Sequence, residues 1–291
     1  MTRAYQLAYV DLETNVIDDA IAYYDRVIGA TLTERDADGR TYFSLGLDHH
    51  NIGLKAAAAS RLEAIGLRIA PESAEDTVRT IKQLGLSPAA KSDARPGVAS
   101  LVEVEVGGHM FHLIPEMAMT GPGFRASGIV PTQLGHMAIM SSDADAILNF
   151  CGAIGFRRTD SFENVATFLT CNRLHHVLNV VAAPFVKLHH LAFELRSRAA
   201  HHDVADFLAT EGCPIVWGPS RHTAGHNLAS YHFDPSRFLI ECYSDMDVHV
   251  PELDIFEPRP WHDAFPQRPR VWPVGQLTTW NTRFDFDFRA V

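Results

Sequence analysis

The chain has 291 residues, of which 46% are hydrophobic and 21% charged, and its net charge is −10. This composition suits about two globular domains and excludes a disordered or collagen-like chain. The acidic balance argues against a nucleic-acid partner, because nucleic-acid-binding domains carry a basic face. No apolar run reaches the ~18 residues of a membrane helix, and the N-terminus shows no secretory leader. We therefore expect a cytoplasmic protein with no membrane partner.

The first half of the chain alternates strands with two helices. A helix predicted to begin near residue 17 ends at Gly29, and a second is predicted over residues 73–84. Each follows an apolar strand and precedes further strand-like segments. The strand segments are YQLAYVDL (5–12), RTYFSLGL (40–47), NIGLKAA (51–57), LEAIGLRIA (62–70) and ASLVEVEVGGHMFHLIPE (99–116).

The second half repeats this order. A strand at 133–140 is followed by a helix that ends at Gly155, and a later helix spans about 200–212. Three further blocks recur in the same order at offsets of 126 to 129 residues: DHHNIGLKAA with LHHVLNVVAA, SAEDTVRTIKQLGL with AHHDVADFLATEGC, and HMFHLIPEM with FLIECYSDM. Such a shared order indicates an internal duplication.

The duplication predicts an α+β protein of two tandem domains, each built from two βαβββ modules. We place the domains at residues 1–120 and 131–250, joined by a Gly/Pro-rich connector. Residues 251–291 break the repeat and hold three of the four tryptophans, so we expect this tail to pack on the domains, with TRFDFDFRAV (282–291) as a strand. Rossmann and P-loop folds are excluded because their glycine motifs are absent.

Histidine is unusually frequent, with 16 residues and four adjacent pairs. Imidazole is both the commonest metal ligand and the usual acid or base near neutral pH. The second half carries His136, the pair His189–His190 and Glu241 on three different strands, whereas the first half has Tyr9 and His112 at two of these places. A carboxylate within an apolar strand must be paired or bound to a metal. Two imidazoles and one carboxylate leave three coordination positions open, which suits non-haem Fe(II).

These motifs resemble the type I extradiol ring-cleavage dioxygenases, two-domain members of the vicinal oxygen chelate superfamily. The matching segments are LGHMAI (134–139), NRLHHVLNV (172–180), KLHHLAFEL (187–195), GPSRHTAGHNLASYHFDPS (218–236) and IECYS (240–244). The resemblance implies a glyoxalase-like fold with a metal-free N-terminal domain and a catalytic C-terminal domain. It also implies cleavage of a catecholic ring next to the diol, with insertion of both atoms of O2, in the catabolism of aromatic compounds.

The resemblance also implies roles for individual residues. His136, His190 and Glu241 would hold Fe(II), with Mn(II) as an alternative. His176 would be the acid/base histidine, and His222 and Tyr231 would bond to the oxygens of substrate and O2. We expect His189 to point to the opposite face of its strand from His190. We also expect a homo-oligomer.

Two other functions stay open: a glyoxalase-like isomerase, which needs a fourth protein ligand to the metal, and a non-catalytic binding protein of the same fold. His176 itself could merely echo His50, which occupies the same place in the first repeat. His201 and His202 match no role in the family and are predicted to lie at a solvated helix start. The chain also departs from the family pattern at Thr223–Gly225 and at Arg237, which stands where the turn usually has glycine.

Overall fold

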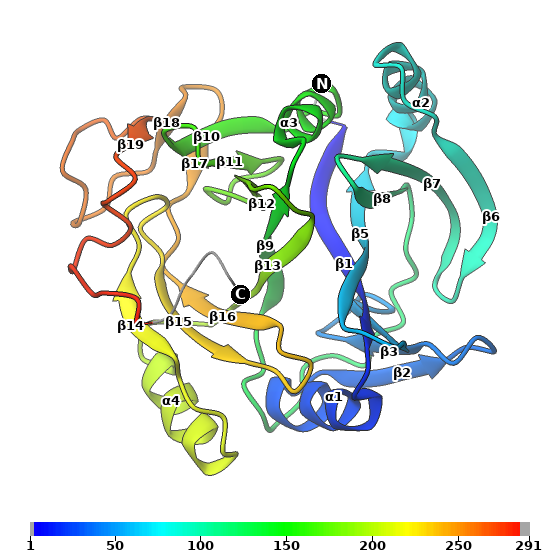
Figure 1. The fold of residues 1–291 in the computed structure, drawn as a ribbon, viewed down its shortest axis with the longest axis horizontal. Helices are drawn as coiled ribbons and strands as arrows, with labels where there is room; N and C mark the ends of the chain where they lie inside the picture. Colours follow the sequence, from blue (N-terminus) through cyan, green and yellow to red (C-terminus); the bar gives the residue numbers. More distant parts are fainter. Residues whose placement is uncertain (1–2, 286–291) are drawn as a thin grey trace.

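Four βαβββ modules follow one another in the computed structural model, which describes residues 3–285 (Figure 1). The first comprises β1 (Ala4–Thr14), α1 (Ile17–Tyr23), the π-helical turn η1 (Tyr24–Ile28), β2 (Thr31–Arg35), β3 (Thr41–Ser44) and β4 (Ile52–Ala56). The second comprises β5 (Arg61–Ile69), the 3-10 turn η2 (Pro71–Ser73), α2 (Ala74–Gln83), β6 (Ala89–Arg95), β7 (Val98–Val106) and β8 (His109–Ile114). The third comprises β9 (Gln133–Ser141), α3 (Ala144–Ala153), β10 (Arg157–Phe162), β11 (Ala166–Thr170) and β12 (Leu178–Ala182). The fourth comprises β13 (Lys187–Glu194), α4 (Ala200–Thr210), β14 (Trp217–Arg221), β15 (Leu228–Phe233) and β16 (Leu239–Ser244). The predicted α+β class and modules are confirmed.

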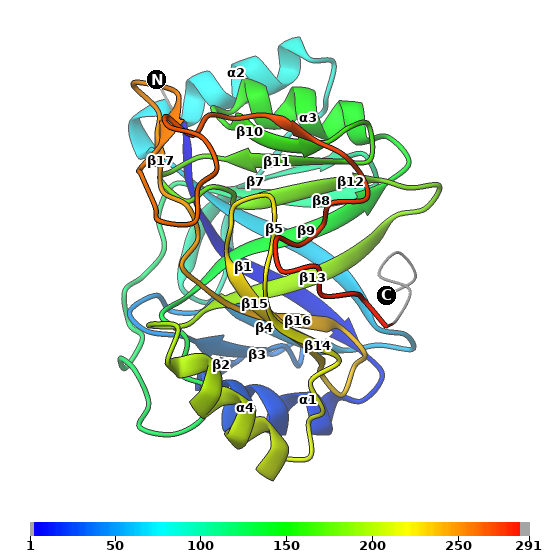
Figure 2. The ribbon, with the colours of Figure 1, turned by 90° about the vertical axis from the view of Figure 1, so that its left-hand side faces the viewer.

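Each pair of modules forms one curved sheet with its helices on the outside (Figures 1 and 2). The strand orders are β2-β3-β4-β1-β5-β8-β7-β6 and β14-β15-β16-β13-β9-β12-β11-β10 with β19 at the edge. The first strands of paired modules run antiparallel, β1 with β5 and β9 with β13, and each also pairs in parallel with the last strand of its own module. In each sheet these four strands, the first and last of both modules, form the centre. Their inward-pointing side chains therefore share one inner face. The division at 1–120 and 131–250 stays a prediction; the first sheet falls within its limits, whereas the second sheet also takes in β19 (Val271–Trp272).

Helix ends lie where the glycines predict them. Gly29 and Gly155 have φ values of 75° and 100°, the left-handed conformation that ends a helix without a Cβ penalty. At its other end α3 is capped by Asp143, whose side chain accepts a hydrogen bond from the backbone N–H of Ala146. None of the helices within residues 3–285 is long and apolar enough to cross a membrane.

The two halves are joined by buried polar contacts as well as by apolar packing. Tyr23 bonds to His232 at 2.6 Å, and the adjacent Tyr24 donates to Asp234 at 3.3 Å. At the opposite end of the interface, His109 donates to the carbonyl oxygen of Met140 at 2.8 Å. Burial makes such bonds costly to break, because each leaves a donor or acceptor unsatisfied.

Residues 251–285 of the tail lie against the second sheet, and Figure 2 shows them crossing those strands. It contains β17 (His249–Val250), β18 (Ile255–Phe256) and β19 (Val271–Trp272), and β19 extends the sheet in parallel with β10. Trp272 packs in an apolar cluster with Phe162 and Phe168. The strand expected at 282–291 is not formed over residues 282–285, and residues 286–291 lie outside the described part.

Candidate metal centre

Strand register aligns the predicted residues across four neighbouring strands. Tyr231 on β15 is paired with Glu241 on β16, Glu241 with Ala192 on β13, and Ala192 with His136 on β9. His190 lies two residues before Ala192, and side chains two apart share a face. The methyl group of Ala192 leaves space between Glu241 and His136 on this inner face.

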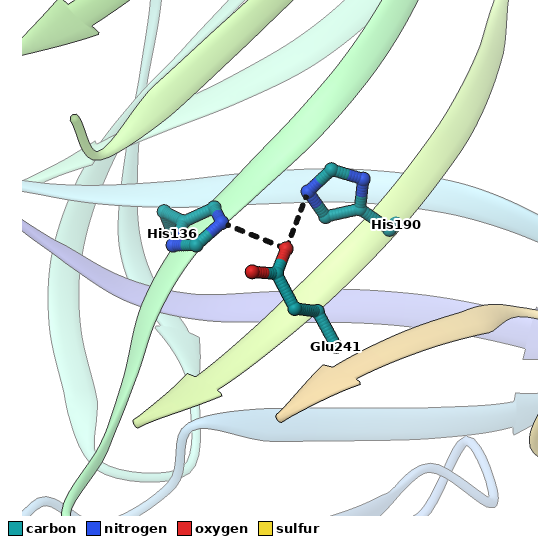
Figure 3. A group of neighbouring side chains, drawn as sticks. All are labelled: His136, His190 and Glu241. Carbon is teal, nitrogen blue, oxygen red and sulfur yellow. Dashed lines mark hydrogen bonds and ion pairs between the residues drawn. The ribbon is translucent and has the colours of Figure 1, made fainter. Parts of the chain in front are cut away.

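The structure brings the three predicted ligands together (Figure 3). His136 Nε2 and His190 Nε2 each lie 3.2 Å from the same carboxylate oxygen, Oε2 of Glu241. All three side chains are buried, and the possible donor atoms lie within 4.8 Å of one another. The group joins strands far apart in the chain at a single point.

The donor set fits a divalent cation. With donors roughly 2.1 Å from an ion, neighbouring donors at right angles are about 3 Å apart, close to the spacing seen. His190 Nε2 is buried and has no hydrogen-bond partner among the described residues, so its lone pair is free for a metal. A set of two nitrogens and one oxygen with open positions is the donor chemistry of non-haem Fe(II) and also accepts Mn(II).

Two further side chains hold the Glu241 carboxylate. Asn227 donates to Oε1 at 2.7 Å, and the Tyr231 hydroxyl donates to Oε2 at 2.9 Å. Burial alone would raise the pKa of Glu241, but His136 and then His190 outweigh it and hold the pKa below its ordinary value. Asn227 was not predicted, because nothing in its local sequence separates an amide that supports a ligand from one in a loop.

His222 lies beside Tyr231. Its Nε2 is 3.0 Å from the Tyr231 hydroxyl and 4.0 Å from Oε1 of Glu241. Burial lowers the pKa of His222 and raises that of Tyr231 well above its ordinary value, with the Glu241 charge adding to the latter. Both groups are thus neutral at pH 7 and available to hydrogen bond at the centre.

His176 lies beside the three predicted metal ligands. Its ring centroid is 4.2 Å from that of His136 and 4.9 Å from that of Phe168. Burial, with a smaller contribution from the nearby His136, holds the pKa of His176 well below its ordinary value. The imidazole is therefore neutral near pH 7 and has a lone pair to accept a proton.

All six predicted residues line one cavity of about 150 Å³. Its remaining walls are mainly apolar side chains from the second sheet and the tail. They include Met140, Phe162, Phe168, Val181, Val274 and Leu277. Gly135 contributes indirectly, because a Cβ there would lie 1.8 Å from the Tyr243 hydroxyl oxygen. That close approach places the Tyr243 ring 4.8 Å from the His136 ring.

The expected orientation of His189 is wrong. His189 also lines the cavity, and its Nδ1 lies 2.7 Å from Nδ1 of His190. The pairing of β13 with β9 shifts register between Leu188 and His190. Such a bulge breaks the alternation of side chains between the two faces, so adjacent residues can share one.

The equivalent place in the first sheet is filled by a different group. Tyr9 on β1 and His112 on β8 bond to each other at 2.8 Å, across the positions of His136 and Glu241. Arg95 and Arg40 lie nearby and both pair with buried Asp11. Burial lowers the pKa of His112 to about 4.

Four further histidines lie outside the candidate metal centre. His201, expected at a solvated helix start, is buried on α4 and bonds to Ser244 at 3.1 Å, whereas His202 is exposed. His226 Nδ1 and His262 Nε2 bond to opposite oxygens of Asp247, at 2.7 Å and 2.9 Å. This second group connects the tail to the loop that follows His222.

The second curved sheet of paired βαβββ modules thus carries a group of two histidines and one carboxylate on its inner face. Residues 133–242 match the model of the Glyoxalase/Bleomycin resistance protein/Dioxygenase superfamily, and this part of the chain is a domain of that superfamily. The predicted resemblance is thereby confirmed.

Relatives of known name share the fold over most of the chain. A metapyrocatechase from Pseudomonas sp. (strain CF600) is 24% identical over 254 residues, covering 78% of this chain and 82% of that protein. The 2,3-dioxygenase LapB from Pseudomonas sp. KL28 superposes with a TM-score of 0.82 at 22% identity, over 89% of this chain and 97% of that one. A Mn(II)-bound glyoxalase from Novosphingobium aromaticivorans also superposes with a TM-score of 0.82, at 24% identity, over 97% of this chain and 93% of that one.

Proposed function

We propose that the chain is an Fe(II)-dependent extradiol dioxygenase, with Mn(II) as an alternative metal. It would cleave a catecholic ring next to its two hydroxyls and insert both atoms of one O2, with no external reductant. The observation that carries the proposal is the set of three ligands beside His176, His222 and Tyr231 in one apolar cavity. The names of the metapyrocatechase and the 2,3-dioxygenase relatives support the same reaction.

His136, His190 and Glu241 would hold the metal and leave three positions open. A divalent ion there would supply a Lewis acid that lowers the pKa of both catechol hydroxyls and brings the two substrates together. Asn227 and Tyr231 would keep the carboxylate oriented through their bonds to its two oxygens. Supporting bonds of this kind fix the direction of a ligand and tune its basicity.

The cavity histidines would handle protons and oxygen contacts. His176, neutral and 4.2 Å from the His136 ring, would accept a proton from the second catechol hydroxyl and return it as the ring opens. His222 and Tyr231 would contact oxygen atoms of the reacting molecules, and Tyr231 would do so through its oxygen, because its one hydroxyl hydrogen goes to Glu241 Oε2. A proton donor fixed in a cavity that excludes water is worth more than one in solution.

We further propose that the substrate is a catechol with one ring and no charged substituent. Among the described residues, no Lys or Arg lines the cavity, so a carboxylated catechol would bury its anion without a counter-charge. An apolar cavity of this volume is also about the size that admits a single benzene ring. Methylcatechols should therefore be turned over at least tenfold more efficiently than 3,4-dihydroxybenzoate or a biphenyl diol.

A glyoxalase-like isomerase is the alternative, because a Mn(II)-bound glyoxalase shares the fold. That reaction calls for a fourth protein ligand, whereas the group of His136, His190 and Glu241 has three members. The neutral His176 would also have no task in such a reaction.

We also propose that the protein is cytoplasmic and homo-oligomeric; size-exclusion chromatography with light scattering tests the assembly.

The test is oxygen consumption by protein loaded anaerobically with Fe(II) and then given catechol or methylcatechols in air. We expect one O2 consumed per ring and a yellow ring-opened product. His176→Phe should retain the metal and slow turnover by roughly 10²–10⁴-fold, the usual contribution of an acid/base group. Absence of oxygen uptake with every catechol, together with isomerisation of a thiol adduct of methylglyoxal, would establish the alternative.

A further inference from the structure

Asp160 is a buried carboxylate next to His175, the neighbour of the cavity residue His176. It lies on β10 and is 2% exposed. Its Oδ1 accepts a hydrogen bond from the backbone N–H of Arg270 at 2.9 Å, and its Oδ2 accepts one from Trp272 Nε1 at 2.7 Å. The same Oδ2 is 3.1 Å from His175 Nε2, an ion-pair distance without hydrogen-bond geometry. The tail thus fixes the carboxylate against His175.

His175 in turn contacts His176 through a ring nitrogen. The two Nδ1 atoms are 3.0 Å apart, and the rings are nearly perpendicular at 89°. Two imidazole nitrogens at this distance require one N–H and one lone pair. The protonation of His175 therefore decides which nitrogen of His176 carries hydrogen.

The carboxylate selects one arrangement. A carboxylate repels a nitrogen lone pair and attracts an N–H, so at 3.1 Å His175 should carry its hydrogen on Nε2, the atom facing Asp160. Neutral His175 then presents a lone pair at Nδ1, and His176 must donate from its own Nδ1. We propose that Asp160 and His175 are positioning residues that hold His176 in the tautomer with a free lone pair on Nε2.

That lone pair is the one the proposed function needs. His176 lines the cavity, and the nitrogen that it uses toward His175 is Nδ1. The opposite tautomer would place a hydrogen on Nε2 and prevent it from accepting a substrate proton. A carboxylate that fixes the tautomer of a catalytic imidazole acts in the same way in serine proteases, where its replacement by an amide costs about 10⁴ in kcat.

The first half of the chain contains a similar histidine pair, which can be compared with His175–His176. His49 Nδ1 and His50 Nδ1 are also 3.0 Å apart, and His49 Nε2 lies 3.2 Å from Glu34. The Glu34 side chain is 48% exposed, whereas that of Asp160 is 2% exposed. The histidine pair is therefore common to both halves, but a buried carboxylate fixed by two other donors occurs at the pair beside the metal centre.

The kinetic test uses Asp160→Asn with Trp272→Phe as its matched control. An amide in place of the carboxylate no longer imposes a hydrogen on His175 Nε2, so we expect kcat to fall roughly 10²–10⁴-fold while KM and bound iron stay within about threefold. Trp272→Phe removes the other side-chain donor to the same oxygen but keeps the carboxylate, and should leave kcat within about threefold. A folded Asp160→Asn protein with wild-type kcat would overturn the proposal.

A spectroscopic test needs neither turnover nor a folded variant at position 160. In wild-type protein loaded with diamagnetic Zn(II), ¹⁵N-histidine NMR distinguishes the two neutral tautomers, and loss of one signal set in His176→Phe assigns His176. We expect hydrogen on Nδ1. Hydrogen on Nε2 would refute the positioning role even if the chain cleaves catechols. Failure of every catechol assay with hydrogen on Nδ1 would instead count against the proposed function, on which the role in catalysis rests.

Discussion

Replacement of Asp234 by Asn should make the protein more stable at pH 8 and reduce its sensitivity to pH. Asp234 begins the turn between β15 and β16 and is 2% exposed. Its Oδ1 accepts from the backbone N–H of Phe238 at 2.8 Å, and its Oδ2 accepts from Tyr24 of the other half at 3.3 Å. Burial raises the pKa of the carboxyl from 3.8 to about 7, although these hydrogen bonds lower it in part.

The direction in which the free energy of unfolding changes with pH follows from proton binding by Asp234. Between about pH 4 and pH 7 the folded state holds a proton on Asp234 that the unfolded state has released, so the free energy of unfolding falls as the pH rises. At about 1.4 kcal/mol per pH unit the full change is roughly 4 kcal/mol, of which about 3 kcal/mol falls between pH 5 and pH 8. Asparagine has the same shape, can accept from Phe238 and carries no charge to bury.

Urea unfolding of both proteins at pH 5 and pH 8 measures this effect. The stability of Asp234→Asn relative to wild type should increase by about 3 kcal/mol between the two pH values. Exposed Asp38 provides the control, because Asp38→Asn makes the same chemical change where no carboxylate is buried. A difference for Asp234→Asn that does not change with pH would refute the reasoning.

Two other variants test the metal centre and the tail. Glu241→Ala should abolish stoichiometric binding of Fe(II), measured by metal analysis after gel filtration, because it removes the one charged ligand; retention of one iron per chain would contradict the assignment. Asp247→Ala should cost roughly 2–4 kcal/mol of unfolding free energy, since it leaves His226 and His262 buried without their partner. Wild-type stability in urea would show that this group does not hold the tail.

The sequence predicts the framework well because its signals are periodic and repeated. Helix ends at Gly29 and Gly155, the order of strands and the convergence of His136, His190 and Glu241 all follow from the duplication and from the alternation of side chains. A residue such as Glu241 is informative because a carboxylate within an apolar strand needs a partner.

Other features depend on contacts that local sequence does not encode. The bulge near His189 changes which face a side chain occupies without a recognisable motif. Asn227 and Asp160 gain their importance from residues 14 and 112 positions away, Glu241 and Trp272. Arg237 adopts φ of 68°, so the left-handed turn is kept there without the usual glycine, and its guanidinium lies 4.0 Å from the Phe233 ring centroid.

The polar contacts across the interface restrict how the two halves can evolve. Tyr23 and Tyr24 of the first half satisfy His232 and Asp234 of the second, in the hairpin that carries Tyr231 and leads to Glu241. Deletion of the first half would expose these groups and loosen the strands that present the metal ligands. The first half therefore supports the strands of the candidate site in the second, although Tyr9 and His112 stand in its own places of His136 and Glu241.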